Sequence, residues 1–133
     1  MMYENSPKEI NLKSPEICEY GDIYARLIAR NIFTEEDEKL WLVAAYRLLM
    51  FAISFVNHRD RDNVCKTTMP DIAKYLAERD NNYISADIDD FARKYPYETK
   101  HIEAGRLWDR LPDATKKAIK DIVVLRLNQE LAA

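Results

Sequence analysis

Glycine is almost missing from this chain. Its 133 residues include only two glycines, Gly21 and Gly105, and five prolines. A phosphate-binding GxxxxGK[ST] loop and a dinucleotide-binding GxGxxG turn each need two or more glycines close together. Here the two glycines lie far apart, so the sequence excludes a complete P-loop ATPase and a dinucleotide enzyme of that type. Tight hairpins also depend on turn residues, so the composition favours helices over a hairpin-rich sheet.

Cysteine and histidine are equally scarce. Cys18 and Cys65 lie far apart and outside any CxxC pattern, and His58 and His101 belong to no HExxH motif. The sequence therefore predicts no metal site, no cofactor and two reduced structural thiols. Reduced thiols are typical of the cytoplasm, and the first residues contain neither the basic nor the apolar segment of a signal peptide. We therefore expect a cytoplasmic protein.

Neither sign of charge dominates the chain. The formal net charge is −3, from 20 Lys and Arg against 23 Asp and Glu, and both signs are spread along the whole sequence. No half is basic enough to predict a broad nucleic-acid-binding face. The strongest apolar run covers 40–56, but Arg47 lies at its middle and the run is shorter than the roughly 20 residues of a membrane span. We interpret this run as a buried helix and expect no membrane span.

The remaining signals predict an all-α fold. Residues 1–14 are polar and aperiodic, which predicts an N-terminal arm or linker before a single all-α domain over 15–133. Thr34 and the four acids after it form the clearest helix start, and the sequence TMPD at 68–71 forms another. The predicted helices cover 15–30, 34–56, 68–79, 85–95, 97–111 and 113–131. The second helix is apolar on nearly all sides, so we expect an irregular bundle of about six helices around a long central apolar helix.

Polar residues and prolines mark the predicted helix boundaries. The segment 57–63 predicts a charged loop, and the polar residues at 80–82 predict the end of the third helix. Ser85 is the predicted N-cap of the fourth helix. Pro96 and Pro112 predict the ends of the fourth and fifth helices, because the residue before a proline disfavours the helical conformation.

No arrangement of titratable residues predicts catalysis. Glu98 and His101 match one copy of the ExxH pattern of di-iron bundles, but that site needs two copies, so we interpret them as an exposed surface pair. Asp87, Asp89 and Asp90 lack the spacing of a calcium loop, so we interpret them as solvated acids on a helix surface. We therefore expect that the chain is not an enzyme.

DNA binding is the alternative function. Residues 68–76 resemble the first helix of a helix-turn-helix, whose second helix would contact bases. That second helix carries the three aspartates, which would repel phosphates, and the predicted connection is longer than the usual turn. A small helix-turn-helix-like DNA-binding regulator therefore stays open as the second possibility.

Five basic residues are the candidate partner-binding residues. They lie in the charged loop and at the start of the last predicted helix, and they are Arg59, Arg61, Lys116, Lys117 and Lys120. A solvated helix face is the simpler interpretation of the three lysines. The alternative is contact with an acidic partner or with a nucleic-acid backbone.

Three segments together resemble a known family. They are DEKLWLVAAYRLL at 37–49, TMPDIAKYL at 68–76, and LWDRL at 107–111 followed by TKKAI at 115–119. This pattern is similar to the all-α domain inserted in the hexameric ATPase of type IV secretion coupling proteins. The resemblance covers about 23–131 and implies a domain that docks a protein partner, either the relaxase–DNA complex or a secreted effector. It also implies that the ATP-binding motor lies elsewhere, which agrees with the missing phosphate loop.

Overall fold

The helices that the structure describes form one packed bundle. The computed structural model describes residues 39–59 and 68–132, and these residues contain five helices and no strand. The helices are α2 (Lys39–Arg59), α3 (Met69–Glu78), α4 (Asn81–Lys94), α5 (Thr99–Asp109) and α6 (Asp113–Ala132). The predicted all-α class is confirmed for this part of the chain. The predicted arm over 1–14, the helix over 15–30 and the helix start at Thr34 lie outside the described residues.

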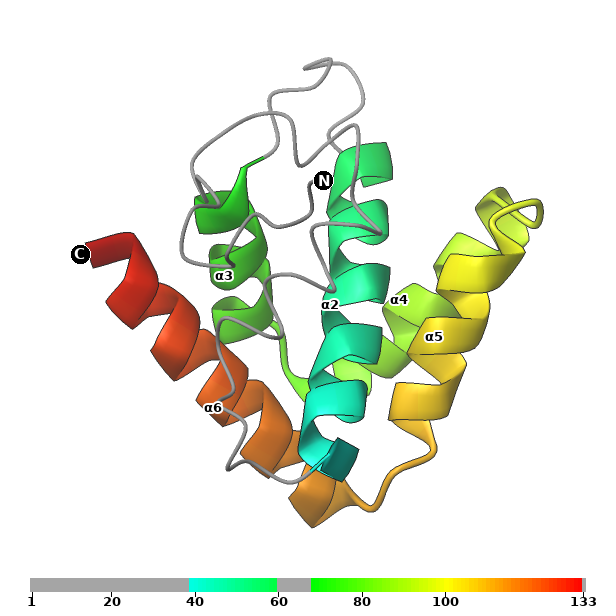
Figure 1. Cartoon of the computed structure of the whole chain (residues 1–133). Coiled ribbons are helices and arrows are strands. Elements are labelled where there is room, and N and C mark those ends of the chain that lie inside the picture. The colour runs from blue at the N-terminus through cyan, green and yellow to red at the C-terminus, as the bar shows by residue number, and fades with distance from the viewer. Residues whose placement is uncertain (1–38, 60–67, 133) are drawn as a thin grey trace, which may run out of the picture.

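Helix α2 contacts every other described helix. In Figure 1 it lies between α3 on one side and α5 on the other, and it also packs against α4 and α6. Its side chains from Leu48 to Ile53 are all buried, because neighbouring helices cover successive sides of α2. The helix continues to Arg59, so the predicted end at Val56 is wrong. The cause is tertiary packing, because the His58 ring stacks on Tyr95 with their centroids 4.0 Å apart.

The start of α3 agrees with its sequence signal. Thr68 is the N-cap, its backbone N–H donates to the Asp71 carboxylate at 2.9 Å, and Pro70 lies in the first turn. The predicted start of α4 is wrong, because Asp80 is its N-cap and the helix begins at Asn81. Aspartate and asparagine favour helix caps as well as turns, so the polar residues at 80–82 open a helix after a two-residue connection.

Helix α5 lies close against its neighbours at one glycine. A Cβ atom at Gly105 would lie 3.1 Å from both the Ile88 Cγ1 and the Phe51 Cδ1 atoms. The missing side chain therefore permits close contact of α5 with α2 and α4. Trp108, one turn further along α5, is fully buried. These contacts fix the inner face of α5 and leave its opposite face toward solvent.

Helix α6 closes the bundle beside α3. Its buried apolar residues Ile119, Val123 and Leu127 recur every four positions, as predicted for one side of a helix. This side packs against α3 and α2. Within 39–59 and 68–132, no helix is both long enough and apolar enough to cross a membrane.

Candidate interaction surface

One of the three aspartates predicted on a helix surface is buried between α3 and α4. The Asp87 carboxylate accepts hydrogen bonds from the Tyr75 hydroxyl at 2.7 Å and from Arg79 at 2.8 and 2.7 Å, and Asp87 is only 7% exposed. Burial, followed by the bond to Asp87, raises the pKa of Tyr75 far above its usual range, and the same carboxylate raises the pKa of Arg79. The solvated interpretation of Asp87 is therefore wrong. Asp87 shares the inner side of α4 with the apolar residues Ile84 and Ile88, and this spacing was a usable signal.

Two of the three candidate lysines on α6 also have internal partners. Lys116 is 7% exposed, and its ammonium lies 3.1 Å from the Asp109 carboxylate and 5.6 Å from the centroid of the Trp108 ring. The Lys120 ammonium donates to the backbone carbonyl of Arg79, and burial lowers the pKa of Lys120. Both lysines lie on the buried side of α6, so a solvated helix face describes only Lys117.

The candidate basic residues do not form one patch. Arg59 ends α2, where its guanidinium lies 5.8 Å from the centroid of the Tyr75 ring. In Figure 1 this end of α2 and the first turns of α6 are at opposite ends of the bundle. Arg61 lies outside the described residues. The structure therefore leaves Lys117, which pairs with Asp121 at 3.4 Å, as the exposed member of the lysine cluster.

A carboxylate bridges two histidines where α2 meets the start of α5. The two Glu98 oxygens lie 2.6 Å from the His58 Nε2 atom and 2.9 Å from the His101 Nδ1 atom. Burial raises the pKa of Glu98, but hydrogen bonds and charge from the two histidines outweigh that effect and lower it overall. The interpretation of Glu98 and His101 as an exposed pair is therefore wrong.

This bridge is a cross-link between helices. In the part of the chain that the structure describes, no group of three or more His, Cys, Asp or Glu side chains is placed to hold a metal ion. The rings of Phe91 and Tyr95 lie within 5.3 Å of the His58 ring, measured between centroids, so aromatic packing surrounds the bridge. No local pattern predicts His58 as the partner of Glu98, because the two residues lie 40 positions apart and the sequence places His58 in a loop.

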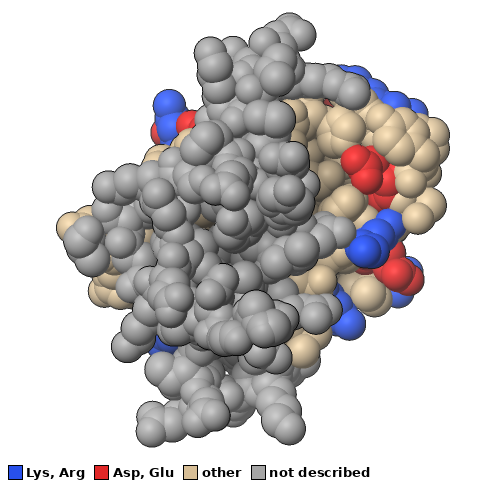
Figure 2. Space-filling model, turned by 45° about the horizontal axis from the view of Figure 1, so that its top comes forward, with Lys and Arg blue, Asp and Glu red and all other residues tan. Residues whose placement is uncertain are grey.

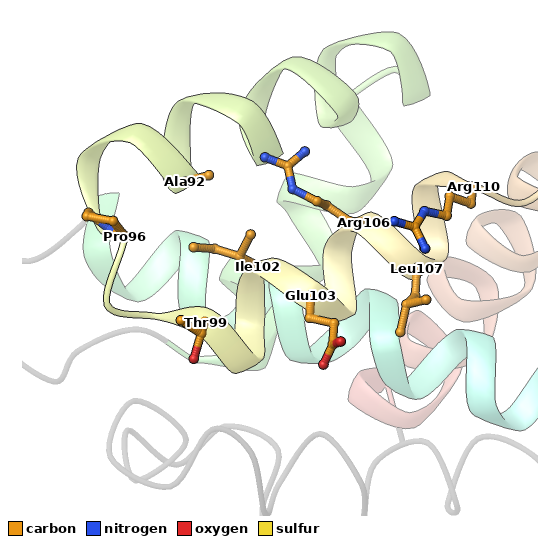
Figure 3. A pocket seen from close by; sticks show the side chains of 8 residues that line it. All are labelled: Ala92, Pro96, Thr99, Ile102, Glu103, Arg106, Leu107 and Arg110. Atoms are coloured by element: carbon orange, nitrogen blue, oxygen red, sulfur yellow. The ribbon is translucent and has the colours of Figure 1, made fainter.

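A surface hollow of about 410 Å³ lies between α4 and α5. Figure 3 shows its lining, which combines apolar side chains with two arginines and one acid. The lining residues are Ala92, Pro96, Thr99, Ile102, Glu103, Arg106, Leu107 and Arg110. We call this feature the α4–α5 hollow. No local sequence pattern predicts this hollow, because its two walls come from different helices.

Charges around the hollow are mixed. Arg106 forms an ion pair with Asp89 at 3.0 Å, and Asp90 pairs with Arg93 and Lys94 on α4. Hydrogen bonds from Arg93 and Lys94 lower the pKa of Asp90 and so favour its ionised form. Figure 2 likewise shows acidic and basic side chains next to each other on the described part of the face in view. Such a surface favours a partner with both charge signs over a uniformly charged one.

In comparisons with known proteins, no family model, no curated protein and no solved structure matches the chain. The resemblance to coupling-protein domains therefore depends on the residue patterns alone.

Proposed function

We propose that this chain is a helical protein-interaction domain that docks substrates for a type IV secretion coupling ATPase. Its substrates are a relaxase–DNA complex or secreted effector proteins, and the domain has no ATPase activity of its own. The proposal includes a cytoplasmic location and a sixth helix over 15–30, which completes a bundle around α2. It rests on one surface feature and on the sequence pattern described above.

The sequence pattern supports the proposal through its placement in the bundle. The segment 68–76 covers the N-cap and most of α3, while 107–111 and 115–119 cover the end of α5 and the start of α6. Helix α3 packs against α6, and α2 packs against both α3 and α5. The segments thus lie on helices that each pack against α2, as expected if they belong to one structural unit.

The α4–α5 hollow carries the functional part of the proposal. Binding sites are typically concave and mainly apolar, with a few polar groups that set orientation. Ala92 and Ile102 supply apolar walls, and Arg106 and Arg110 supply donors. Tyr97, next to the lining residue Pro96, is 66% exposed. Tyrosine and arginine are enriched at protein interfaces, so this region suits a protein partner.

A binding experiment with a matched pair of variants tests the proposal. The purified chain is titrated by calorimetry with a relaxase bound to its DNA, and separately with an effector, both from the same organism. Ala92→Arg places a long side chain in the hollow, and we expect it to weaken binding at least about tenfold. Ala86→Arg makes the same change at an exposed position of α4 outside the hollow and should leave binding unchanged. If neither substrate binds the unmodified chain, the proposal is wrong.

The structure removes one objection to the DNA-binding alternative. Only Arg79 and Asp80 separate α3 from α4, so the predicted long connection, which opposed a helix-turn-helix, is wrong. Against this alternative, Asp89 and Asp90 remain on the outer side of α4, where they would face phosphates. We expect no binding to duplex DNA at low salt. Binding that weakens steeply as salt rises would instead support the regulator.

A further inference from the structure

We propose that the α4–α5 hollow binds a segment of its protein partner in which an apolar side chain lies between an acidic and a basic one. The acid would pair with Arg110 and the base with Glu103. This inference rests on the proposed function for the identity of the partner. The chemistry of the recognised segment follows from the hollow itself.

Arg110 is the cation of the hollow for which the described residues supply no ion-pair partner. It is exposed at the C-terminal end of α5, and among the described residues no carboxylate forms an ion pair with its side chain. Arg106 differs, because its guanidinium already binds Asp89. A guanidinium offers several donors in a planar fork that matches a carboxylate. An incoming carboxylate would therefore find its strongest available donors at Arg110.

Glu103 is the corresponding acid of the hollow. It is exposed in the lining of the hollow, and no basic residue of the described chain pairs with its side chain. Arg110 lies seven positions after Glu103, which corresponds to about 10.5 Å along a helix. Salt screens exposed charges at about this distance, so the two do not neutralise each other. As far as the described residues are concerned, both side chains can therefore bind a partner.

Apolar surface lies between these two charges. Leu107 is half-buried, and Figure 3 shows its side chain pointing to the same side of α5 as Glu103. Ile102, Ala92 and Pro96 continue the apolar lining toward α4. An apolar side chain of the partner that enters here loses contact with water, while the charged groups on either side fix its position.

The mixed charge argues against a polyanion in the hollow. Asp89 is 65% exposed beside Arg106, and Glu103 is part of the lining. A nucleic-acid strand would place several phosphates near these acids, and like charges in close contact are costly. A protein segment with one acid and one base avoids this conflict. A second copy of α5 has the same order of acid, apolar residue and base, so self-association must be measured as well.

The probe is a labelled helical peptide of about 16 residues, long enough to form helix in an alanine-rich sequence. It carries one glutamate and one lysine seven positions apart with a leucine midway, and fluorescence anisotropy reports its binding to the full chain. We expect Arg110→Glu to weaken binding about tenfold. Replacing the peptide glutamate by lysine should restore binding to Arg110→Glu while weakening binding to the unmodified chain. Lys74→Glu, a charge reversal at an exposed position of α3 outside the hollow, should have no effect.

Several results would overturn the inference. One is that the peptide binds Arg110→Glu as tightly as the unmodified chain. Another is that binding stays equal when the peptide glutamate becomes glutamine or its leucine becomes serine. A third is that the chain binds single-stranded DNA more tightly than the peptide. A dimer in sedimentation that dissociates with Arg110→Glu would assign the hollow to a second copy and overturn it too.

The two proposals fail separately. In one outcome the peptide does not bind, whereas a relaxase or effector binds the unmodified chain and no longer binds Ala92→Arg. This outcome overturns the segment chemistry and retains the docking function. A peptide that binds with the expected charge dependence, without binding of either substrate, retains the segment chemistry and overturns the secretion function.

Discussion

Two arginines at equivalent helix positions differ in the partners of their side chains. Arg79 and Arg110 are the C-cap residues of α3 and α5. The side chain of Arg79 binds the buried Asp87 with two hydrogen bonds, and its backbone carbonyl accepts one from Lys120. The side chain of Arg110 lines the α4–α5 hollow without such a partner in the described chain. The corner between α3, α4 and α6 thus uses its charges internally, whereas the outer face of α5 presents them to solvent.

Hydrogen-bonding partners, rather than exposure, separate the two arginines, because the Arg79 side chain is 42% exposed and only the Asp87 carboxylate that it binds is buried. A buried carboxylate must be paired and hydrogen-bonded, so Asp87 stabilises the fold only while its donors Tyr75 and Arg79 are present. Charges on the outer face of α5 keep most of their hydration, so their loss costs the fold little. Stability measurements on neighbouring residues of the same type can therefore separate the two regions.

The largest expected change in the free energy of unfolding is at Asp87. Asp87→Ala leaves the buried Tyr75 hydroxyl and the Arg79 guanidinium without their acceptor, which should lower the free energy of unfolding by about 3 kcal/mol. Asp89→Ala, two positions along the helix, removes only a surface pair and should cost less than about 0.5 kcal/mol. Denaturation with urea, monitored by circular dichroism, measures both values. Equal losses for the two variants would mean that the Asp87 site is open to water, and the contrast between regions would fail.

Adjacent lysines provide a second comparison. Lys116→Ala removes the ammonium that binds Asp109 and the methylene chain that packs near Trp108, which should cost about 1.5 kcal/mol. Lys117→Ala changes an exposed side chain and should cost less than about 0.5 kcal/mol. The same denaturation experiment compares them. A larger loss for Lys117 would contradict the placement of Lys116 inside the bundle.

A smaller, pH-dependent effect is expected at Glu98. Its pKa in the folded protein is below the ordinary value of 4.5, so the folded state favours the ionised form. The resulting stabilisation is complete above about pH 5 and is lost as the pH falls below 4.5 through the folded pKa. We expect Glu98→Gln to lose less stability than the unmodified chain between about pH 5 and 3. Parallel pH profiles for the two proteins would show that the histidine bridge does not stabilise the charged carboxylate.

Local signals predict most helix boundaries. A long-range contact explains the wrong end of α2, and an ambiguous local signal explains the wrong start of α4. The cap at Thr68 and the break at Pro112 depend on a few adjacent residues, and both agree with the structure. The end of α2 depends on contact between His58 and Tyr95, which are distant in the sequence. Asp80 was ambiguous because aspartate favours both turns and helix caps.

The candidate surface was harder to predict than the fold. Lys116 and Lys120 lie three positions before the buried residues Ile119 and Val123, respectively, so helical spacing predicts that they lie on the same side of α6. The α4–α5 hollow has no comparable signal. Its shape depends on how two helices pack. Which of its charges lack a partner among the described residues follows only from the side-chain geometry of the folded chain.

The smallest expected effect on stability is at Arg110. Arg110→Glu should change the free energy of unfolding by less than about 0.5 kcal/mol, because the substituted side chain is exposed and forms no ion pair in the described chain. Arg79→Glu should destabilise the protein measurably, since it would place a second acid beside Asp87. Urea denaturation of the two variants compares equivalent helix ends directly. Equal destabilisation would mean that Arg110 has a structural role, and a loss of partner binding in Arg110→Glu could then no longer be assigned to a lost contact in the hollow.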